Sequence, residues 1–180
     1  MIFWDLDGVL ADFDAAYTNL SGVVWDYSKA VTEEQKLAKW ERIRACPYFF
    51  RDLPWIPGAR DLILYVRDSL TAAGGDERQL GILSAATAKV PGCADEKALW
   101  IDRELPWIPL ANRIIVTSKQ AKNQYAVSPS GHPNVLVDDL APSIADWEQA
   151  GGIGILFRDA AQARQDFEDY LNGTLSTARK

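Results

Sequence analysis

The chain has 180 residues and a formal net charge of −6, and 48% of its residues are hydrophobic. This apolar content is enough to bury a core in one domain, with room for a small inserted subdomain, and it excludes a disordered chain. The acidic balance, without a basic cluster, argues against binding of duplex nucleic acid or of an anionic membrane surface.

The N-terminal third begins with a predicted strand over residues 2–5 and then becomes helical. Asp7 and Gly8 follow the strand, and helical patterns cover residues 11–20 and 32–45. The second pattern opens with Thr32 and Gln35, a capping box. The interval from Gly8 to about Pro57 contains helices and a proline-rich connector but no predicted strand. We therefore expect a helical insert above a sheet.

The remaining elements alternate between helix and strand. Apolar runs at 80–84, 113–117, 134–139 and 153–157 predict strands, and helical patterns are placed at 59–75, 94–105, 118–126, 142–152 and 160–173. Five short apolar strands separated by helices are typical of a mostly parallel sheet with helices on both faces. We predict an α/β, Rossmann-like fold.

Polar side chains collect where the predicted strands end. In open parallel sheets, ligands bind in the crevice beyond the carboxyl ends of the strands. The residues at these ends are Asp5, Asp7, Ser84, Thr117, Lys119, Lys122, Asp138 and Asp139. Clustered carboxylates without histidine or cysteine favour a hard cation such as Mg²⁺.

These residue types suit phosphoryl transfer. A carboxylate beside Mg²⁺ can attack phosphorus and become an aspartyl-phosphate. A second carboxylate two residues later can protonate the leaving oxygen and then deprotonate water. A serine hydroxyl and a lysine ammonium can bind the remaining phosphoryl oxygens.

Four short stretches resemble the motifs of the haloacid dehalogenase superfamily of phosphotransferases. DLDGV at 5–9 resembles motif I, Ser84 in ILSA motif II, the lysines of SKQAK motif III, and VDDL at 137–140 motif IV. The stretches DLDGVLADF, YFFRDLPWIPGA, RIIVTSK and WEQAGGIGILF are similar to the 5′(3′)-deoxyribonucleotidase group.

This resemblance implies a fold, a domain division and roles for individual residues. The implied fold is a five-stranded parallel sheet of strand order 5-4-1-2-3, with a small helical cap inserted after strand 1. The core is expected to comprise residues 1–13 and 58–180, and the cap residues 14–57. Asp5 is expected to be the nucleophile and first Mg²⁺ ligand. Asp7 is expected to be the general acid/base and to offer its carbonyl to Mg²⁺, while Ser84 and the backbone of Ala85 bind phosphate.

Three assignments keep alternatives open. Adjacent strand residues point to opposite sides, so one of Asp138 and Asp139 is expected to ligate Mg²⁺ directly; the resemblance favours Asp139, with Asp138 held through water. The motif III lysine is Lys122 or Lys119, with Lys122 preferred. Phe13 matches a position where the family places an aromatic ring against the nucleobase, and it can equally be a core residue at the cap hinge.

The cap and motif II are less informative. The animal nucleotidases of the group that this chain resembles carry TSP or similar at motif II, where this chain has SAAT and lacks the second hydroxyl. Trp25, Trp40 and Phe49 can line an aromatic pocket for a base or pack the core of the cap. Lys89 can approach the phosphate or remain in solvent.

We predict Mg²⁺-dependent hydrolysis of a phosphomonoester, with a pyrimidine deoxynucleoside 5′-monophosphate as the expected substrate. A phosphatase of another small metabolite is the nearest alternative. A receiver-type phospho-acceptor lacks the second acid that Asp7 provides here. A non-catalytic nucleotide-binding relative is a third possibility.

Partners and location are inferred from features that the sequence lacks. Cys46 and Cys93 lie far apart and in no CxxC pattern, so neither a disulfide framework nor a zinc knuckle is expected. No apolar run approaches the ~20 residues that cross a bilayer. We expect a cytoplasmic monomer or homodimer whose partner is a small phosphomonoester, and neither a nucleic acid polymer nor a membrane.

Overall fold

The computed structural model describes residues 1–25 and 30–174. Its sheet contains five parallel strands in the order β3-β2-β1-β4-β5. The strands are β1 (Ile2–Trp4), β2 (Leu80–Ala85), β3 (Arg113–Val116), β4 (Val135–Asp138) and β5 (Ile153–Leu156). This architecture confirms the predicted fold class, and its strand order is the one implied by the resemblance.

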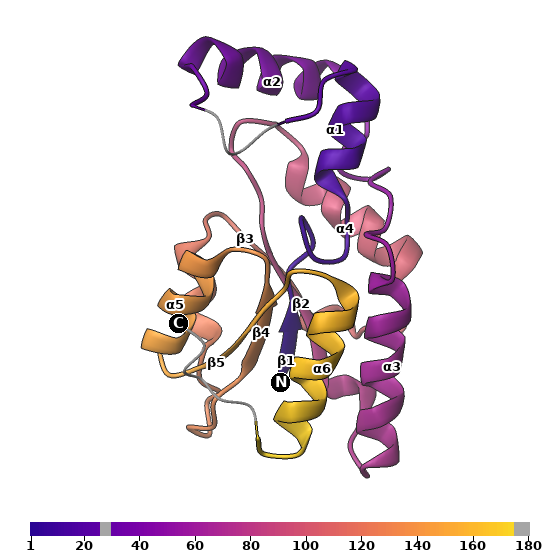
Figure 1. Cartoon of the computed structure of the whole chain (residues 1–180), viewed down its shortest axis with the longest axis vertical. Helices are drawn as coiled ribbons and strands as arrows, with labels where there is room; N and C mark the ends of the chain where they lie inside the picture. The colour runs from indigo at the N-terminus through magenta and orange to yellow at the C-terminus, as the bar shows by residue number, and fades with distance from the viewer. Residues whose placement is uncertain (26–29, 175–180) are drawn as a thin grey trace.

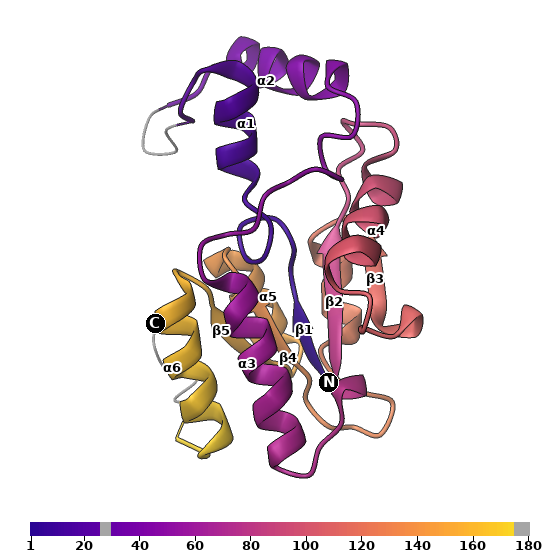
Figure 2. The same ribbon diagram turned by 90° about the vertical axis from the view of Figure 1, so that its right-hand side faces the viewer.

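Side chains of the central strands alternate between two apolar layers, as expected for strands buried on both faces. Ile2 and Trp4 pack in the larger cluster with residues of α3 (Ala59–Ala72), α4 (Cys93–Glu104) and α6 (Ala160–Leu171). Phe3, between them in sequence, packs in the smaller cluster with residues of α5 (Ala141–Gln149). Figures 1 and 2 show this sheet between its helical layers.

The described residues also include three short 3₁₀ helices: η1 (Glu77–Gln79), η2 (Leu110–Asn112) and η3 (Gln120–Tyr125). The segment predicted as a helix at 118–126 is η3, and its backbone bonds span three residues, for example from Lys122 N to Lys119 O at 3.1 Å. A 3₁₀ turn is the usual form of such a short connector.

Two helices stand apart from the sheet, beyond the end of β1 (Figures 1 and 2). They are α1 (Phe13–Ser21) and α2 (Glu33–Ala45). Asp12 caps α1 by accepting a hydrogen bond from Ala15 N. The predicted capping box of α2 is present: Thr32 accepts from Gln35 N, and the Gln35 side chain accepts from Thr32 N.

The chain enters and leaves this helical segment through two paired stems, residues 10–12 and 54–56. Asp12 N donates to Pro54 O, and Ile56 N donates to Leu10 O, both at 2.8 Å. Ala11 and Trp55 form an antiparallel bridge between these bonds. The two stems therefore meet directly above the sheet.

In the described part of the chain, no helix combines the length and the apolar character that crossing a membrane requires.

Candidate active site

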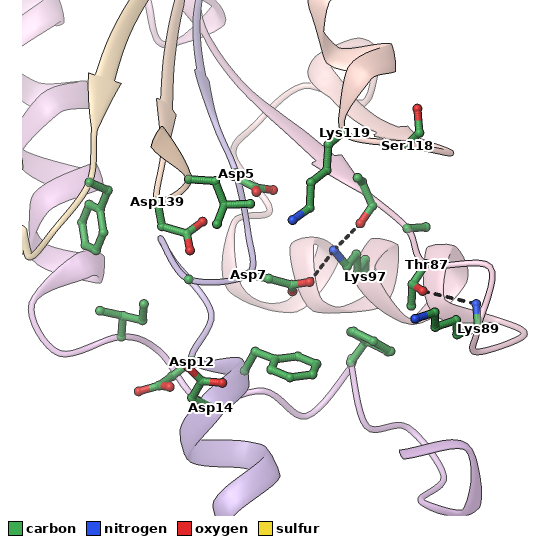
Figure 3. Close-up of a pocket in the computed structure, with 18 of the residues that line it drawn as sticks. Asp5, Asp7, Asp12, Asp14, Thr87, Lys89, Lys97, Ser118, Lys119 and Asp139 are labelled. Carbon is green, nitrogen blue, oxygen red and sulfur yellow. Dashed lines mark hydrogen bonds and ion pairs between the residues drawn. The ribbon is translucent and has the colours of Figure 1, made fainter. Parts of the chain in front are cut away.

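A cavity of about 1030 Å³ lies between the carboxyl ends of the strands and the helices α1 and α2. Asp5, Asp7 and Asp139 line it from the sheet, and Phe13, Lys39 and Trp40 line it from α1 and α2. Figure 3 shows the three carboxylates directed into this space, with Lys119 extending toward it from the side of β3. The structure thus brings residues far apart in the sequence to one place.

Asp5 follows β1 directly, and its backbone continues the sheet through a 3.0 Å bond from its N–H to Val137 O. Its side chain accepts from Leu6 N at 2.8 Å and pairs with Lys122 Nζ at 2.8 Å. Burial alone would raise the pKa of Asp5, but the charges of Lys122 and Lys97 outweigh burial and hold the pKa below its ordinary value. Asp5 is therefore an ionised carboxylate at the edge of the cavity.

Gly8 allows the chain to turn after Asp7. Its φ of +79° lies in the left-handed region that favours glycine. A Cβ atom at this position would stand 2.5 Å from Oδ2 of Asp139. The glycine of the DLDGV stretch therefore serves the turn and also leaves room for the carboxylate of Asp139.

Lys122 ties two of the acids together from η3. Its Nζ lies 2.8 Å from Asp5 Oδ2 and 2.7 Å from Asp138 Oδ2, and only 2% of its side chain is exposed. Burial would lower the pKa of Lys122, but Asp5 and Asp138 raise it above its ordinary value. Lys119 instead stands on the exposed side and lines the cavity. The two lysines thus occupy different positions, with Lys122 nearest the predicted nucleophile.

Lys97 is a site residue that the sequence prediction missed. From α4, its Nζ donates to Asp7 Oδ2 at 2.9 Å, to Ser84 Oγ at 2.9 Å and to Ala85 O at 2.8 Å. Its side chain is buried and also lines the cavity. A lysine in mid-helix has no fixed spacing to a strand end, so only the apolar residues Cys93, Trp100 and Ile101, which share its buried helix face, could have indicated it.

The two carboxylate oxygens of Asp7 differ in their surroundings. Its Oδ2 is held by Lys97, whereas its buried Oδ1 has no hydrogen-bond partner among the described residues. Burial raises the pKa of Asp7 above its ordinary value, and Lys97 opposes the shift only in part. A carboxyl group with a raised pKa is suited to proton transfer.

Asp138 and Asp139 differ in their surroundings. Asp138 is fully buried, with Oδ1 accepting from Leu140 N and Oδ2 from Lys122. Asp139 lines the cavity. Burial raises the pKa of Asp139 to about 7, and the charges of Asp5 and Asp138 add to the effect. This excess of negative charge marks the place where a cation would be most favourable.

Oxygen atoms of Asp5, Asp138 and Asp139 lie within 4.8 Å of one another. Such a set of carboxylate oxygens fits a hard divalent cation of the Mg²⁺ type. Without a cation the three carboxylates repel one another, and the charges of Asp5 and Asp138 add to the effect of burial on the pKa of Asp139. The donor set therefore fits the metal that the sequence predicted.

The end of β2 supplies the groups predicted to bind phosphate. Ser84 is fully buried and accepts from Lys97, and it also lies within hydrogen-bonding range of Asp5. Ala85 lines the cavity, as does Thr87 two residues later. Thr87 Oγ1 accepts from Lys89 N at 3.2 Å (Figure 3). A hydroxyl is thus present near motif II, although it is displaced along the chain.

The wall of the cavity on the side of α1 and α2 is aromatic. The Phe13 ring centroid lies 5.4 Å from that of Phe49, 6.1 Å from that of Phe50 and 6.2 Å from that of Trp40. Trp40 and Phe50 line the cavity together with Phe13. Trp25 instead packs against Tyr17, with ring centroids 5.8 Å apart. The aromatic residues of the cap therefore divide between the cavity wall and the cap interior.

Lys89 lies at the border between the cap and the core. It lines the cavity, and its Nζ stands 5.2 Å from the centroid of the Trp40 ring. Its carbonyl accepts from Arg44 Nη1 of α2 at 3.1 Å. This lysine is exposed, but it also joins the cap to the loop after β2.

Comparison with known proteins places the chain in a family. The sequence model of the family described as "5' nucleotidase, deoxy (Pyrimidine), cytosolic type C protein" matches residues 1–169. Proteins of Bordetella pertussis (strain Tohama I) and Bordetella bronchiseptica (strain RB50), each named "Putative 5'(3')-deoxyribonucleotidase", are 32% identical over 118 residues. These alignments cover 58% of this chain and 60% of each relative.

A solved structure shares the fold. A Streptococcus pneumoniae TIGR4 protein, titled as a hydrolase, superposes with a TM-score of 0.51 and 14% sequence identity. The superposition covers 93% of this chain and 97% of the other. At this identity the likeness supports the fold alone.

Proposed function

Because the chain belongs to the cytosolic type C family of deoxy 5′-nucleotidases, we propose that it is a phosphatase of nucleoside monophosphates, with pyrimidine deoxynucleoside 5′-monophosphates as its preferred substrates. The observation that carries the proposal is the pair of carboxylates after β1, each held by its own buried lysine. Asp5 pairs with Lys122, and Asp7 pairs with Lys97. Both carboxylates face a cavity large enough for a nucleotide.

We assign Asp5 and Asp139 as direct metal ligands, with the carbonyl of Asp7 as a third protein ligand. Asp138 is assigned to a water-mediated role because both of its oxygens already accept hydrogen bonds. When bound, Mg²⁺ supplies positive charge that balances the carboxylates and the transferring phosphoryl group.

The first half-reaction transfers the phosphoryl group to Asp5. A carboxylate oxygen of Asp5 forms a bond to phosphorus while the bond from phosphorus to the leaving oxygen breaks. Asp7 donates its proton to that oxygen, so the nucleoside departs as a neutral alcohol. Ser84, the N–H of Ala85 and Lys122 hold the equatorial oxygens, and Lys97 keeps Asp7 in place.

The second half-reaction returns Asp5 to its starting form. Asp7, now a carboxylate, takes a proton from water, and the water oxygen bonds to phosphorus. The bond between phosphorus and Asp5 breaks, releasing inorganic phosphate and restoring both carboxyl groups. The same residue thus acts as acid in one step and as base in the next.

We also propose that residues 14–57 act as a cap over the site. The segment carries α2 and all of α1 except its first residue, Phe13. The aromatic wall formed by Phe13, Trp40 and Phe50 faces the carboxylates across the cavity. Such an arrangement would exclude water while Asp5 is attacked.

The proposal is tested by a phosphate-release screen over nucleoside monophosphates and common sugar phosphates, with and without Mg²⁺. We expect Mg²⁺-dependent release, fastest with pyrimidine deoxynucleoside 5′-monophosphates. Asp5→Asn is expected to abolish turnover while circular dichroism and the thermal melt show an intact fold. Near-normal turnover by Asp5→Asn would reject Asp5 as the nucleophile, and absence of release from every nucleotide would reject the function.

A further inference from the structure

The cap contains a lysine that the proposed chemistry does not use. Lys39 lies in the middle of α2, and only 6% of the residue is exposed. Its Nζ stands 4.7 Å from the centroid of the Phe13 ring, 5.0 Å from that of Tyr17 and 4.3 Å from that of Trp25. Three aromatic rings thus surround one ammonium group.

Burial of this ammonium has a cost that apolar packing alone would avoid. Desolvation lowers the pKa of Lys39, and Asp14 opposes the shift. The electron-rich faces of the three rings offset part of the desolvation, because a cation over an aromatic face is attracted by the ring quadrupole. A methionine of similar length would fill the same space without a charge to desolvate. The charge itself therefore indicates a role beyond packing.

The position of Lys39 indicates that role. Lys39 and Phe13 line the active-site cavity, whereas Tyr17 and Trp25 are not among its described lining residues. The ammonium thus links two rings of the cap interior to one ring of the cavity wall. It connects α2 to α1 at the point where α1 presents Phe13 to the cavity.

We propose that Lys39 is a positioning residue that fixes the Phe13 ring and thereby selects substrates that carry a planar base over sugar phosphates that carry none. This inference rests on the proposed function and adds the device by which the cap recognises the base. Every nucleobase has a π-face that can stack on an aromatic ring. A ring held in one orientation before binding loses less entropy when the base arrives.

Phe13 receives only part of its support from rings away from the cavity: Phe49, with its ring centroid 5.4 Å away, is buried in the core. Trp40 and Phe50 line the same wall. The ring pairs with Phe49 and Phe50 are edge-on or tilted, at interplanar angles of 76° and 38°. Lys39 is the link from this wall to the interior rings Tyr17 and Trp25.

The test separates the base from the phosphate by using two probes. Thymidine carries the base without a phosphate, and inorganic phosphate carries the phosphate without a base. Binding of each is measured by isothermal titration calorimetry to wild type, Lys39→Met, Lys39→Arg and the control Lys36→Met. Lys36 lies one turn earlier on α2, pairs with Glu33 and has 46% of its side chain exposed.

We expect Lys39→Met to weaken thymidine binding by about tenfold and to leave phosphate binding unchanged. Lys39→Arg, which keeps the cation, is expected to stay within about threefold of wild type. Lys36→Met should behave as wild type. In steady-state kinetics with dTMP, Lys39→Met should raise KM with little change in kcat, because the interaction is present equally in the ground and transition states.

A double-mutant cycle with Phe13→Leu tests the link itself. If Lys39 acts through Phe13, the effect of Lys39→Met on thymidine binding should disappear in the Phe13→Leu background. If Lys39→Met does not fold, Lys39→Gln replaces it in the cycle.

Four results would overturn the inference: unchanged thymidine binding in Lys39→Met, an equal loss of both probes, additivity in the cycle, or no thymidine binding by wild type. None of these results depends on hydrolysis. A protein that binds thymidine in this manner but releases no phosphate from any nucleotide would leave the inference standing and reject the proposed function.

Discussion

Gly8 combines two constraints at one residue, a left-handed backbone and a carboxylate 2.5 Å from where its Cβ would lie. We expect Gly8→Ala to cost about 1–2 kcal/mol through its backbone and to displace Asp139. A displacement of about 1 Å at a reacting centre can cost on the order of 10²-fold in rate. Urea denaturation and phosphate release measure the two effects separately.

Gly22→Ala provides the control for this substitution. Gly22 has a φ of +70°, and nothing lies within 4 Å of its would-be Cβ. A similar loss of stability with normal activity is expected there. Equal activities of the two variants would contradict the role given to the space beside Asp139.

Lys97 holds three acceptors at once, so its removal affects both stability and rate. In Lys97→Met, Ser84 and Ala85 lose a buried donor, at about 1–3 kcal/mol for each group left unpaired. Asp7, whose side chain is 32% exposed, is expected to lose orientation rather than much stability. We predict that kcat falls by about 10²–10⁴-fold, the usual contribution of general acid/base catalysis.

Arg103→Met is the matched control on the same helix. Its side chain is 45% exposed and pairs with Glu104 and Asp52 at the surface. The control should keep wild-type kcat in the phosphate-release assay. A Lys97→Met variant with normal kcat would show that Asp7 keeps its orientation without this lysine.

At the scale of elements, the strands were predictable because each is a short apolar run, and parallel strands buried on both faces need such runs. The capping box at Thr32 was predictable because it depends on a local spacing. The 3₁₀ form of η3 was not, since helix type over so short a segment depends on tertiary packing rather than on local sequence. Lys97 was missed because its partners lie at the ends of β1 and β2, to which a mid-helix position has no fixed spacing. Lys39 was missed because its role arises from the packing of α2 on α1, which the local sequence does not specify.

The capping box of α2 gives a prediction for the stability of this helix. Thr32→Ala removes the bond to Gln35 N and is expected to cost about 1 kcal/mol. Because α2 contacts the sheet domain at few points, we expect faster hydrogen exchange in α2 and little change at the strands. Hydrogen exchange with mass spectrometry measures both. Thr71→Ala, near the end of α3, should leave the exchange of α2 unchanged.

At the scale of the whole molecule, the carboxylate cluster makes stability depend on a divalent cation. A cation at about a hundred times its Kd adds about 2.7 kcal/mol to the free energy of unfolding. We expect Mg²⁺ to raise the melting temperature and to restore activity after EDTA treatment, whereas equal ionic strength of NaCl does neither. Differential scanning fluorimetry and phosphate release follow the two effects.

The variant Asp139→Asn distinguishes the effect of the Asp139 charge on stability from the role of Asp139 in binding the metal. It removes a half-buried carboxylate whose charge is disfavoured by desolvation and by Asp5 and Asp138, so the metal-free variant should melt above metal-free wild type. The same variant should show no further rise with Mg²⁺. Asp146→Asn, an exposed change on α5, should melt and respond as wild type. A normal Mg²⁺ response in Asp139→Asn would exclude Asp139 as a direct ligand.

The paired stems at residues 10–12 and 54–56 allow the segment between them to vary among related proteins. Because residues 10–12 and 54–56 meet through hydrogen bonds at 2.8 Å, the inserted segment begins and ends at one spot. Exchanging that segment for a shorter or longer one changes loop-closure entropy only slightly. Evolution can therefore replace the inserted segment, to which we assign substrate selection, while the strand ends that carry the proposed catalytic residues keep their geometry.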